Sequence, residues 1–566
     1  MTTPSGGDDA IARVCRAFEA DGFHVSQDEI RRWKGGVGLI ARHATATTYE
    51  NGEPKRAYYV EGSPYEMGFL LGWMCEPDIA EMTETYIENF IRSMIPRLGT
   101  ADENEEDNRL YDFFLKLVTG MIRSGKALAD VPDAYIQEVE GLVEGCLEAN
   151  AGSPVTAERI WALNVGFDCL LAHLYACKLP RLRRVRAARR LRAPMACNAL
   201  AILNDAAADG ALFGRDFMFP TAGVLQKTAC LIVYRPKPAG EDGSLPFVSV
   251  TTPGFVGSIA AMNAHGVAGG VDVVRAGNCT PERIGVNSLL LVRDTIEHSE
   301  TIDAAVDRIE VTPRGVTWLY PLAADGGDGP DRACIVEAGA SMPEIDVCSY
   351  PRRLIRSLVP SRQFVSEHPT TRQRNGIMVR WDDYVEPTDY RPFNDGLWRR
   401  KPKRRYPDAF TRVGRIDRTH EEHNCPSSSY FAPLRARRNQ VVICSNHYVI
   451  PEMRLCAMTQ WINILESMCA DNSQWRYDEL NRRTLLALQD GPIDAETAKE
   501  LIDFLAPNRV TGHPTYYEKS PKSPDGLETA IEGVISLFDL KRRTVESHYG
   551  YSCDDWIRIR LPAYVG

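Results

Sequence analysis

Apolar residues recur with a helical period in the first third of the chain. Near the N-terminus this period is marked by Val14, Phe18 and Phe23. The same period is found in three later stretches, at Leu70–Trp73, Ile136–Leu147 and Ile160–Tyr175. We therefore expect a soft tail and helical cap over residues 1–50, followed by a mainly helical N-terminal segment over residues 51–196.

From Cys197 onward the apolar runs become short, which is the pattern of strands. Strands are predicted at 199–203, 211–219, 229–234, 247–251, 257–262, 333–336 and 441–445, with a closing hairpin over 533–548. One helix is predicted over 287–309, and residues 351–432 form an irregular insertion rich in Arg, Pro and Tyr. The pattern alone supports an α+β fold, with 197–566 as one domain.

Composition narrows the class of protein. The chain has 566 residues and a net charge of −10, which does not favour a nucleic-acid-binding protein. The acidic stretch Met1–Asp9 lacks the features of a signal peptide, and no apolar run reaches the roughly 18–20 residues of a membrane span. The 15 cysteines are odd in number and dispersed, as in a reducing compartment. We expect a cytoplasmic protein without nucleic-acid or membrane partners, and the sequence leaves a homo-oligomer open.

Several sequence blocks occur in an informative order. They are Gly62–Gly68, Cys197 with Gly214-Arg215-Asp216-Phe217, Gly257–Gly266 continuing to Gly285–Ser288 and Arg293, and Val442–His447 with the closing hairpin. Together they resemble the acyl-CoA:6-aminopenicillanate acyltransferase-like family of N-terminal-nucleophile hydrolases, a distant relative of the choloylglycine (bile-salt) hydrolases. The resemblance covers most of the chain except the N-terminal tail and residues 351–432.

This resemblance implies a four-layer α-β-β-α sandwich and a cysteine nucleophile, Cys197, that becomes the first residue of a mature chain. Its own α-amine, with a pKa of about 7.7–8.0, can then accept the proton of a thiol whose pKa is about 8.5. The resemblance therefore requires a cut between Ala196 and Cys197. Taken singly, Cys197 is better interpreted as a small buried core residue, because free cysteine packs as a hydrophobe, and only the surrounding pattern favours the nucleophile.

Two further residues take roles from the resemblance. Asn446, in Ser445-Asn446-His447, corresponds to an asparagine that donates to the oxyanion of the reaction intermediate, and the alternative is an asparagine that only completes a turn. Arg215 lies where relatives carry an arginine beside the nucleophile, where its charge would favour the thiolate. An edge-strand arginine facing solvent is the alternative for Arg215.

The chain departs from the family pattern at two places. Met218 stands where an aspartate is expected, and Asp216 stands where an asparagine is expected. Asp216 either reaches the nucleophile's pocket in place of that aspartate or has a structural role. The segment Val267–Asp272 lacks the Asn-Tyr of many relatives, so a backbone N–H is expected to be the second oxyanion donor, and Gly269-Gly270 would let the substrate approach closely.

Other motifs carry less chemistry. His420, His423 and Cys425 do not have the spacing of a structural zinc site, and Gly35–Gly38 is a turn without the lysine of a phosphate loop. The basic runs Arg181–Arg192 and Arg399–Arg405 are either solvated segments or attract the phosphates of an acyl-CoA.

The sequence thus favours a cysteine amidohydrolase or acyltransferase that acts on a linear amide, with Cys197, Arg215, Asp216 and Asn446 as site residues. Its substrate is a small-molecule amide or an acyl donor such as an acyl-CoA, and no metal or other cofactor is required. The alternative is a non-catalytic protein that keeps the same scaffold to bind a ligand or partner, and Met218 is the residue that favours it.

Overall fold

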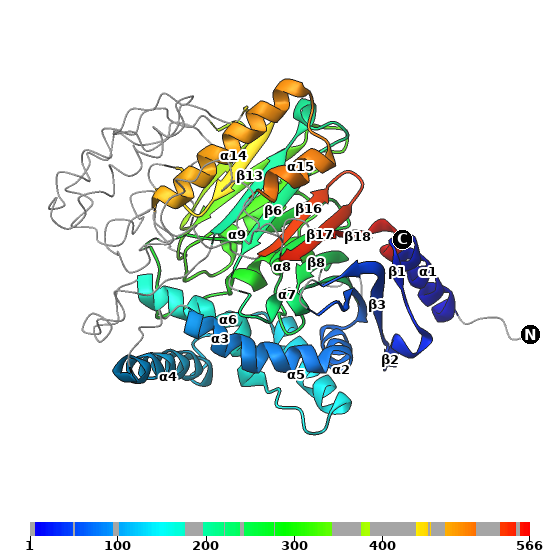
Figure 1. Cartoon of the computed structure of the whole chain (residues 1–566), viewed down its shortest axis with the longest axis vertical. Helices are drawn as coiled ribbons and strands as arrows, with labels where there is room; N and C mark the ends of the chain where they lie inside the picture. Colours follow the sequence, from blue (N-terminus) through cyan, green and yellow to red (C-terminus); the bar gives the residue numbers. More distant parts are fainter. Residues whose placement is uncertain are drawn as a thin grey trace, which may run out of the picture.

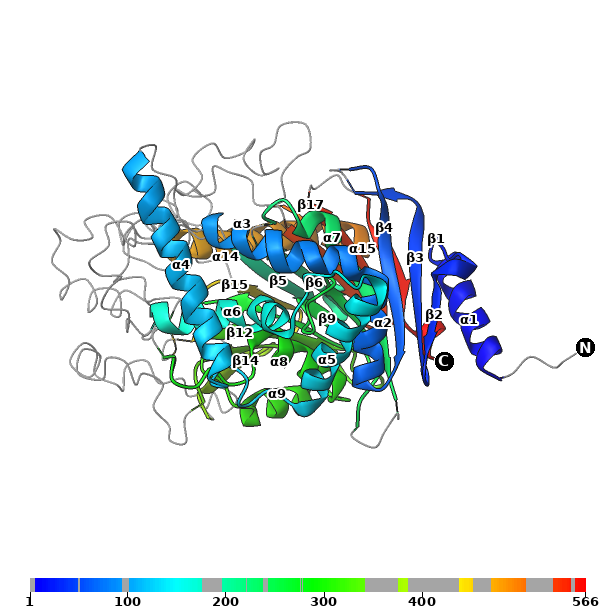
Figure 2. The ribbon, with the colours of Figure 1, turned by 90° about the horizontal axis from the view of Figure 1, so that it is seen from below.

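The computed structural model describes residues 6–48, 51–93, 101–175, 196–219, 221–237, 243–274, 276, 278–341, 375–384, 437–450, 453, 470–504, 533–550 and 555–566. Two β-sheets face each other in the middle of the molecule, and helices cover the outer face of each (Figures 1 and 2). Helices α14 (Ala470–Asp490) and α15 (Ala495–Ile502) pack on the smaller sheet, whereas α8 (Ser288–Glu297) and α9 (Ile302–Val311) pack on the larger one. The fold is therefore mixed α+β, as the sequence predicted.

The smaller sheet has six strands in the order β15-β5-β6-β16-β17-β18, and all its neighbours are antiparallel. The strands are β5 (Ala196–Ile202), β6 (Leu212–Met218), β15 (Val441–Ser445), β16 (Gly533–Asp539), β17 (Thr544–Gly550) and β18 (Ile557–Arg560). The predicted strands at 199–203, 211–219 and 441–445 and the hairpin at 533–548 are confirmed. Short apolar runs predicted them well because both faces of these strands are buried.

The larger sheet has twelve strands along the path β1-β3-β4-β7-β8-β9-β10-β12-β13-β14, with β2 added to β3 and β11 added to β12. Its first strands are β1 (Phe23–His24), β2 (Ile30–Trp33), β3 (Gly36–Thr47), β4 (Pro54–Gly62), β7 (Cys230–Pro236) and β8 (Phe247–Thr251). The others are β9 (Ala260–Asn263), β10 (Val267–Gly270), β11 (Asp272–Val273), β12 (Trp318–Ala324), β13 (Arg332–Ala338) and β14 (Ile377–Trp381).

The prediction of a helical cap over residues 1–50, followed by helices, is wrong in part. The helix α1 (Gly6–Ala20) is followed by strands β1 to β4, which lie between Phe23 and Gly62. Glycines in β3 obscured the strand pattern, because they make room for a helix: a Cβ at Gly38 would lie 2.9 Å from Met74 Cε, and one at Gly36 would lie 3.0 Å from Leu70 Cδ1. Strand β4 then pairs in parallel with β7, which joins this segment to the larger sheet.

Most of the remaining helices form a block beside the sheets (Figure 2). They are α2 (Pro64–Glu81), a short π-helical turn η2 (Met82–Tyr86), α3 (Ile87–Ser93), α4 (Ala101–Arg123), α5 (Asp133–Ala149) and α6 (Ala157–Tyr175). Short helices α7 (Leu225–Thr228) and α16 (Pro562–Val565) and the turns η1 (Gln27–Glu29) and η4 (Asn204–Ala206) complete the described elements. The helical reading of the region that follows β4 is therefore correct.

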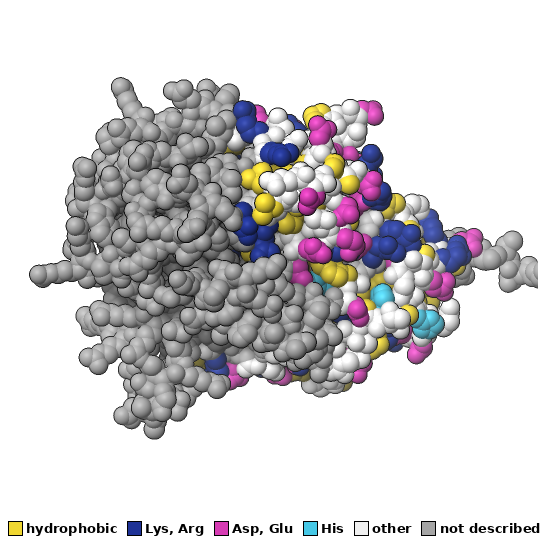
Figure 3. Space-filling model, turned by 45° about the horizontal axis from the view of Figure 1, so that its top comes forward, with side chains coloured by type: hydrophobic (Ala, Val, Ile, Leu, Met, Phe, Trp, Pro, Cys, Tyr) yellow, Lys and Arg dark blue, Asp and Glu magenta, His cyan; other side chains and the backbone are white. Residues whose placement is uncertain are grey.

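Two predicted boundaries differ from the structure. The single helix expected over 287–309 is two helices, because Thr301 starts α9 as an N-cap whose side chain accepts from Ala304 N. Within the expected insertion, residues 377–381 form the edge strand β14, and nearly all the rest lies outside the described residues. None of the helices described is long and apolar enough to cross a membrane. Figure 3 shows acidic and basic side chains interspersed over the described part of one face.

Helices α2 and α5 pack unusually closely through glycines on both. A Cβ at Gly68 would lie 2.0 Å from Glu138 O, and a Cβ at Gly145 would lie 2.0 Å from Phe69 O. The backbones therefore touch where side chains would normally separate them. This contact explains why Gly68 ends the first of the sequence blocks noted above, and it anchors the N-terminal helices.

We expect Gly145→Ala to lower the free energy of unfolding by about 1–3 kcal/mol, because the added methyl group must push the two helices apart. Urea unfolding followed by circular dichroism measures the change. Gly120→Ala in α4 is the matched control, since a Cβ there meets nothing within 4 Å and the better helix former should be neutral or stabilising by up to about 1 kcal/mol. Equal effects of the two substitutions would contradict the close packing.

Candidate active site

Cys197 is the second residue of β5, which lies between β15 and β6 in the smaller sheet. Its side chain is 1% exposed. In the antiparallel register Cys197 lies opposite Phe217, and Ala199 lies opposite Arg215. Side chains directly opposite each other point to the same face of a sheet, so Cys197, Arg215 and Phe217 share the face directed at the larger sheet.

Asn446 is brought to Cys197 by the pairing of β15 with β5. Ser445 lies opposite Asn198, so the next residue, Asn446, comes level with Cys197. Asn446 Oδ1 accepts a hydrogen bond of 2.7 Å from the backbone N–H of Cys197, and Asn446 Nδ2 donates to Val273 O at 2.8 Å. The predicted nucleophile and the predicted oxyanion donor are thus in direct contact.

Arg476, on α14, contacts both Cys197 and Asn446. It was not singled out from the sequence. Its guanidinium donates to Cys197 O at 2.8 Å, to Asn198 Oδ1 at 2.7 Å and to Asn446 Oδ1 at 2.7 Å. The side chain is fully buried. A signal was present in the sequence, because Arg476 falls on the buried stripe of α14 made up of Ser473, Arg476, Tyr477, Leu480, Asn481 and Thr484.

Arg215 and Arg476 contact β5 from opposite faces of the smaller sheet. Arg215 forms an ion pair with Asp272 in which both side chains have no exposed surface, so Arg215 does not face solvent. Its guanidinium also donates to Asn198 O at 2.8 Å and to Val271 O. A Cβ on Gly270 would come within 2.7 Å of Arg215 Nε, so that glycine provides the space for the arginine. Asp272 had no predicted role, although it ends the Val267–Asp272 segment that departs from the family pattern.

Asp216 lies on the opposite face of the smaller sheet from Cys197. The alternative in which Asp216 reaches the nucleophile's pocket in place of the usual aspartate is therefore wrong. Side chains alternate along β6, and Asp216 lies opposite Asn198 on the face covered by α14 and α15. Asn198 Nδ2 donates to Asp216 Oδ2 at 3.0 Å, and burial raises the pKa of Asp216 well above its usual range. Met218 also lies on that face, because it is two residues further along the strand.

Burial raises the pKa of the Cys197 thiol to about 12 in this uncut chain. The positive charges of Arg215 and Arg476 act in the opposite direction, while Asp272 and Asp216 reinforce the increase. The thiol is therefore protonated at neutral pH, and it lacks a free α-amine because its nitrogen is still part of a peptide bond. In this form the site is held in position but is not activated.

Other predicted features lie elsewhere. His420, His423, Cys425 and the basic runs Arg181–Arg192 and Arg399–Arg405 fall outside the described residues. Within the described ranges, no group of three or more His, Cys, Asp or Glu side chains is arranged to hold a metal ion. The nine cysteines in those ranges are all free thiols.

No family model matches the chain. A protein of Archaeoglobus fulgidus, described only as uncharacterized, is 27% identical over 516 residues, which cover 90% of this chain. The match covers 66% of the archaeal protein, so the chain spans just under two thirds of that relative's length. Protein dcd1A of Dictyostelium discoideum is 22% identical over 369 residues, which cover 62% of this chain and 72% of that protein. Neither description states an activity.

The Arg215–Asp272 pair gives a stability prediction. In a Cys197→Ala background, Arg215→Met should lower the free energy of unfolding by about 3–5 kcal/mol, because it leaves the Asp272 carboxylate buried without its cation. Adding Asp272→Asn should recover at least half of that loss, as measured by urea unfolding. Arg123→Met is the control, since its ion pair with Glu158 is exposed and should be worth about 0–1 kcal/mol. Additive losses in the double variant would contradict the coupling.

Proposed function

We propose that this chain is a cysteine amidohydrolase or acyltransferase of the N-terminal-nucleophile type, acting on linear amides through an acyl-thioester on Cys197. The observation that carries the proposal is the 2.7 Å hydrogen bond from the Cys197 backbone nitrogen to Asn446 Oδ1. That nitrogen is the atom that a cut before Cys197 would convert into an α-amine. Asn446 lies 249 residues further along the chain, and its side chain would hold the new amine in place beside the thiol.

Self-cleavage would supply the amine. The Cys197 thiolate attacks the carbonyl carbon of Ala196, a C–S bond forms as the peptide C–N bond breaks, and the nitrogen takes up a proton to become the α-amine. Water then hydrolyses the thioester, which leaves a carboxylate on Ala196 and a free thiol on Cys197. No metal or redox partner enters this sequence of steps.

In turnover the α-amine accepts the thiol proton, and the thiolate attacks the acyl carbon of the substrate amide. The substrate nitrogen leaves with the proton returned by the ammonium group. Water completes hydrolysis, or a second amine completes acyl transfer. Arg476 favours the neutral form of the amine, because a nearby positive charge disfavours an ammonium group.

Asn446 is suited to both steps. Two donors, the Cys197 N–H and Arg476, meet one end of its amide, and one acceptor, Val273 O, meets the other. This pattern fixes the orientation of the amide. Nδ2 carries two hydrogens, and Val273 O takes one, so the second can be donated to an oxyanion. Asn446 Oδ1 meanwhile accepts a hydrogen bond from the amine. The lone pair of the amine nitrogen then points away from the asparagine and is available to accept a proton.

The layer order supports the same class. Helices α14 and α15, the smaller sheet, the larger sheet, and helices α8 and α9 follow one another across the molecule. This order supports the α-β-β-α arrangement that the resemblance implies, and Cys197 is the second residue of a strand in an inner layer. Met218 replaces the usual aspartate, and the buried carboxyl group of Asp272 raises the pKa of the Cys197 thiol in the uncut chain. The substrate is a small-molecule amide or an acyl donor such as an acyl-CoA.

N-terminal sequencing of the purified protein should find a large fragment that begins Cys-Asn-Ala. Cys197→Ala should abolish both cleavage and amide hydrolysis, whereas Cys230→Ala, a buried thiol in β7, should leave cleavage intact. Asn446→Ala should lower the rate by roughly 100-fold or more with the fold retained, because an oxyanion donor is lost. An active enzyme that remains one uncut chain would refute the mechanism, and an uncut, inactive chain would favour the non-catalytic alternative.

Cleavage should also depend on pH. Because the thiol of the uncut chain has a pKa of about 12, its thiolate fraction rises about tenfold per pH unit below that value, and the thiolate is the attacking species. We therefore expect the cleavage rate of freshly refolded protein to rise about tenfold per unit between about pH 6 and pH 9, as followed by gel electrophoresis. A rate that is level across this range would mean that another group removes the proton.

A further inference from the structure

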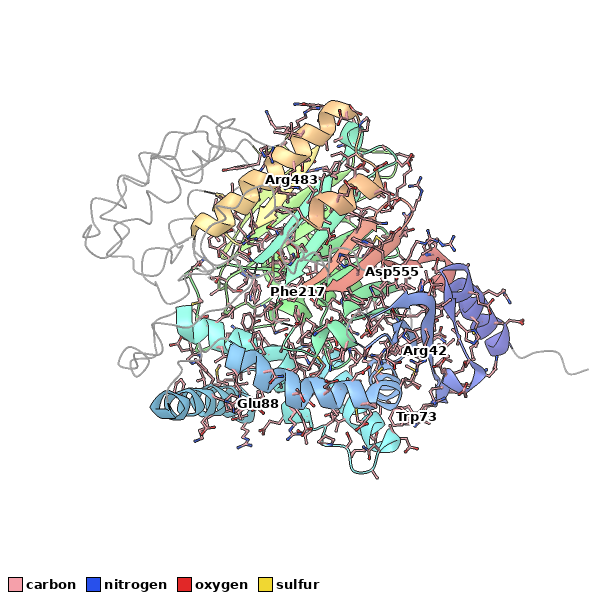
Figure 4. All side chains as sticks on the ribbon, in the orientation of Figure 1. Arg42, Trp73, Glu88, Phe217, Arg483 and Asp555 are labelled. Atoms are coloured by element: carbon pink, nitrogen blue, oxygen red, sulfur yellow. The ribbon has the colours of Figure 1, made fainter. Side chains whose placement is uncertain are left out.

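An apolar cavity lies directly beside the candidate active site. It is bounded by η2, α3, α4 and α6 of the N-terminal helical block and by the end of β6. Aromatic side chains dominate its wall, among them Phe90, Phe167, Phe217, Phe219, Phe255 and Trp318. Figure 4 places Phe217, a residue of β6, in the middle of the molecule.

Phe217 connects the cavity to Cys197. It lies directly opposite Cys197 in the β5–β6 register and on the same face, so the two Cβ atoms are about 4.5–5.5 Å apart. Phe219 stacks on Phe217 with ring centroids 5.0 Å apart, and Phe90 stacks on Phe219 at 4.9 Å. A continuous aromatic wall therefore runs from beside the thiol into the cavity.

Most polar groups in the wall are already occupied, and the exception is the buried hydroxyl of Tyr86, which has no hydrogen-bond partner among the described residues. Asn164 donates to Ile160 O and Gly254 O and accepts from Val256 N. Asn287 caps α8 by accepting from Leu290 N, and it donates to Asn164 O. Ser288 donates to Asp168. Since these three are engaged within the protein and no charged side chain of the described ranges lines the wall, the cavity suits an uncharged occupant that is mainly hydrocarbon.

We infer that this cavity binds the acyl group of the substrate, and that this group is an uncharged hydrocarbon chain or an aryl-ended chain. The inference rests on the proposed function for the identity of the reacting bond, since the acyl carbon must lie at Cys197 Sγ while the rest of the acyl group extends past Phe217. Because α3, α4 and α6 supply much of the wall, residues N-terminal to the proposed cut would determine acyl specificity.

Binding can be tested without turnover, because the cavity is present in the uncut chain. ω-Bromododecanoate quenches tryptophan fluorescence on contact, and Trp318 lines the cavity. With the Cys197→Ala protein we expect saturable quenching that is largely lost in Trp318→Phe. Dodecanedioate should compete at least 30-fold more weakly than dodecanoate, because its second carboxylate would be buried without a partner. Absence of quenching, quenching that persists without Trp318, or equal competition by the two acids would overturn the inference.

Two substitutions from different walls narrow the cavity. Ala162→Phe on α6 and Leu115→Phe on α4 should each weaken binding of ω-bromododecanoate at least tenfold, and both replace half-buried residues. Ala495→Phe on α15 is the matched control, because it is a half-buried alanine outside the cavity and should bind as the parent does. Unchanged binding in both cavity variants, with thermal unfolding like that of the parent, would count against the site.

Turnover separates failure of this inference from failure of the proposed function. With the unsubstituted protein, kcat/KM for N-acyl-p-nitroanilides should rise about fourfold per methylene from acetyl to octanoyl, as expected when each CH₂ is buried. Hydrolysis that does not depend on chain length would refute the acyl site and leave the amidohydrolase proposal standing. Specific binding without any cleavage or hydrolysis would leave the cavity as a hydrocarbon site and refute the catalytic role.

Discussion

The ion pair between Arg215 and Asp272 fixes how the two sheets face each other. Arg215 belongs to β6 of the smaller sheet and Asp272 to β11 of the larger, and neither side chain has exposed surface. Burying two charges is costly unless each is neutralised and hydrogen-bonded. Here the guanidinium meets the carboxylate and three backbone carbonyls, those of Asn198, Asp216 and Val271. Since Cys197 lies on the same face of the same sheet, the position of the thiol depends on this pair remaining intact.

Sequence reasoning located the strands around the site better than those at the N-terminus. Strands β5, β6, β15 and the β16–β17 hairpin are short apolar runs separated by turn residues, and such runs identify strands buried on both faces. Strand β3 was missed because Gly36 and Gly38, which let α2 approach closely, have no side chains that could show an alternating pattern. The break between α8 and α9 falls in the polar stretch 297–301, which ends in the N-cap Thr301, and the prediction extended one helix across it.

The candidate site was predictable where a short motif marked it. Cys197, Arg215 and Asn446 each sit in a recognisable block, and the structure brings all three to one point. Arg476 sits in no such block, and its role depends on α14 packing across the smaller sheet, a tertiary contact that local pattern does not reveal. Asp216 shows the opposite case, because its adjacency to Arg215 in sequence places the two side chains on opposite faces of a strand.

The parallel pairing of β4 with β7 has a consequence for what a mature protein would be. A cut before Cys197 would leave two polypeptides, yet residues 57–62 of the first remain hydrogen-bonded, strand to strand, with residues 231–236 of the second. The far ends are also fastened, since Asp21 beside α1 accepts from Arg560 and Tyr564 near the C-terminus. The products would therefore form an obligate heterodimer that melts as one cooperative unit and does not dissociate on dilution. The larger sheet would be divided between the two polypeptides, whereas the smaller sheet would belong to the second, so the strands of the first would need the second in order to complete their sheet.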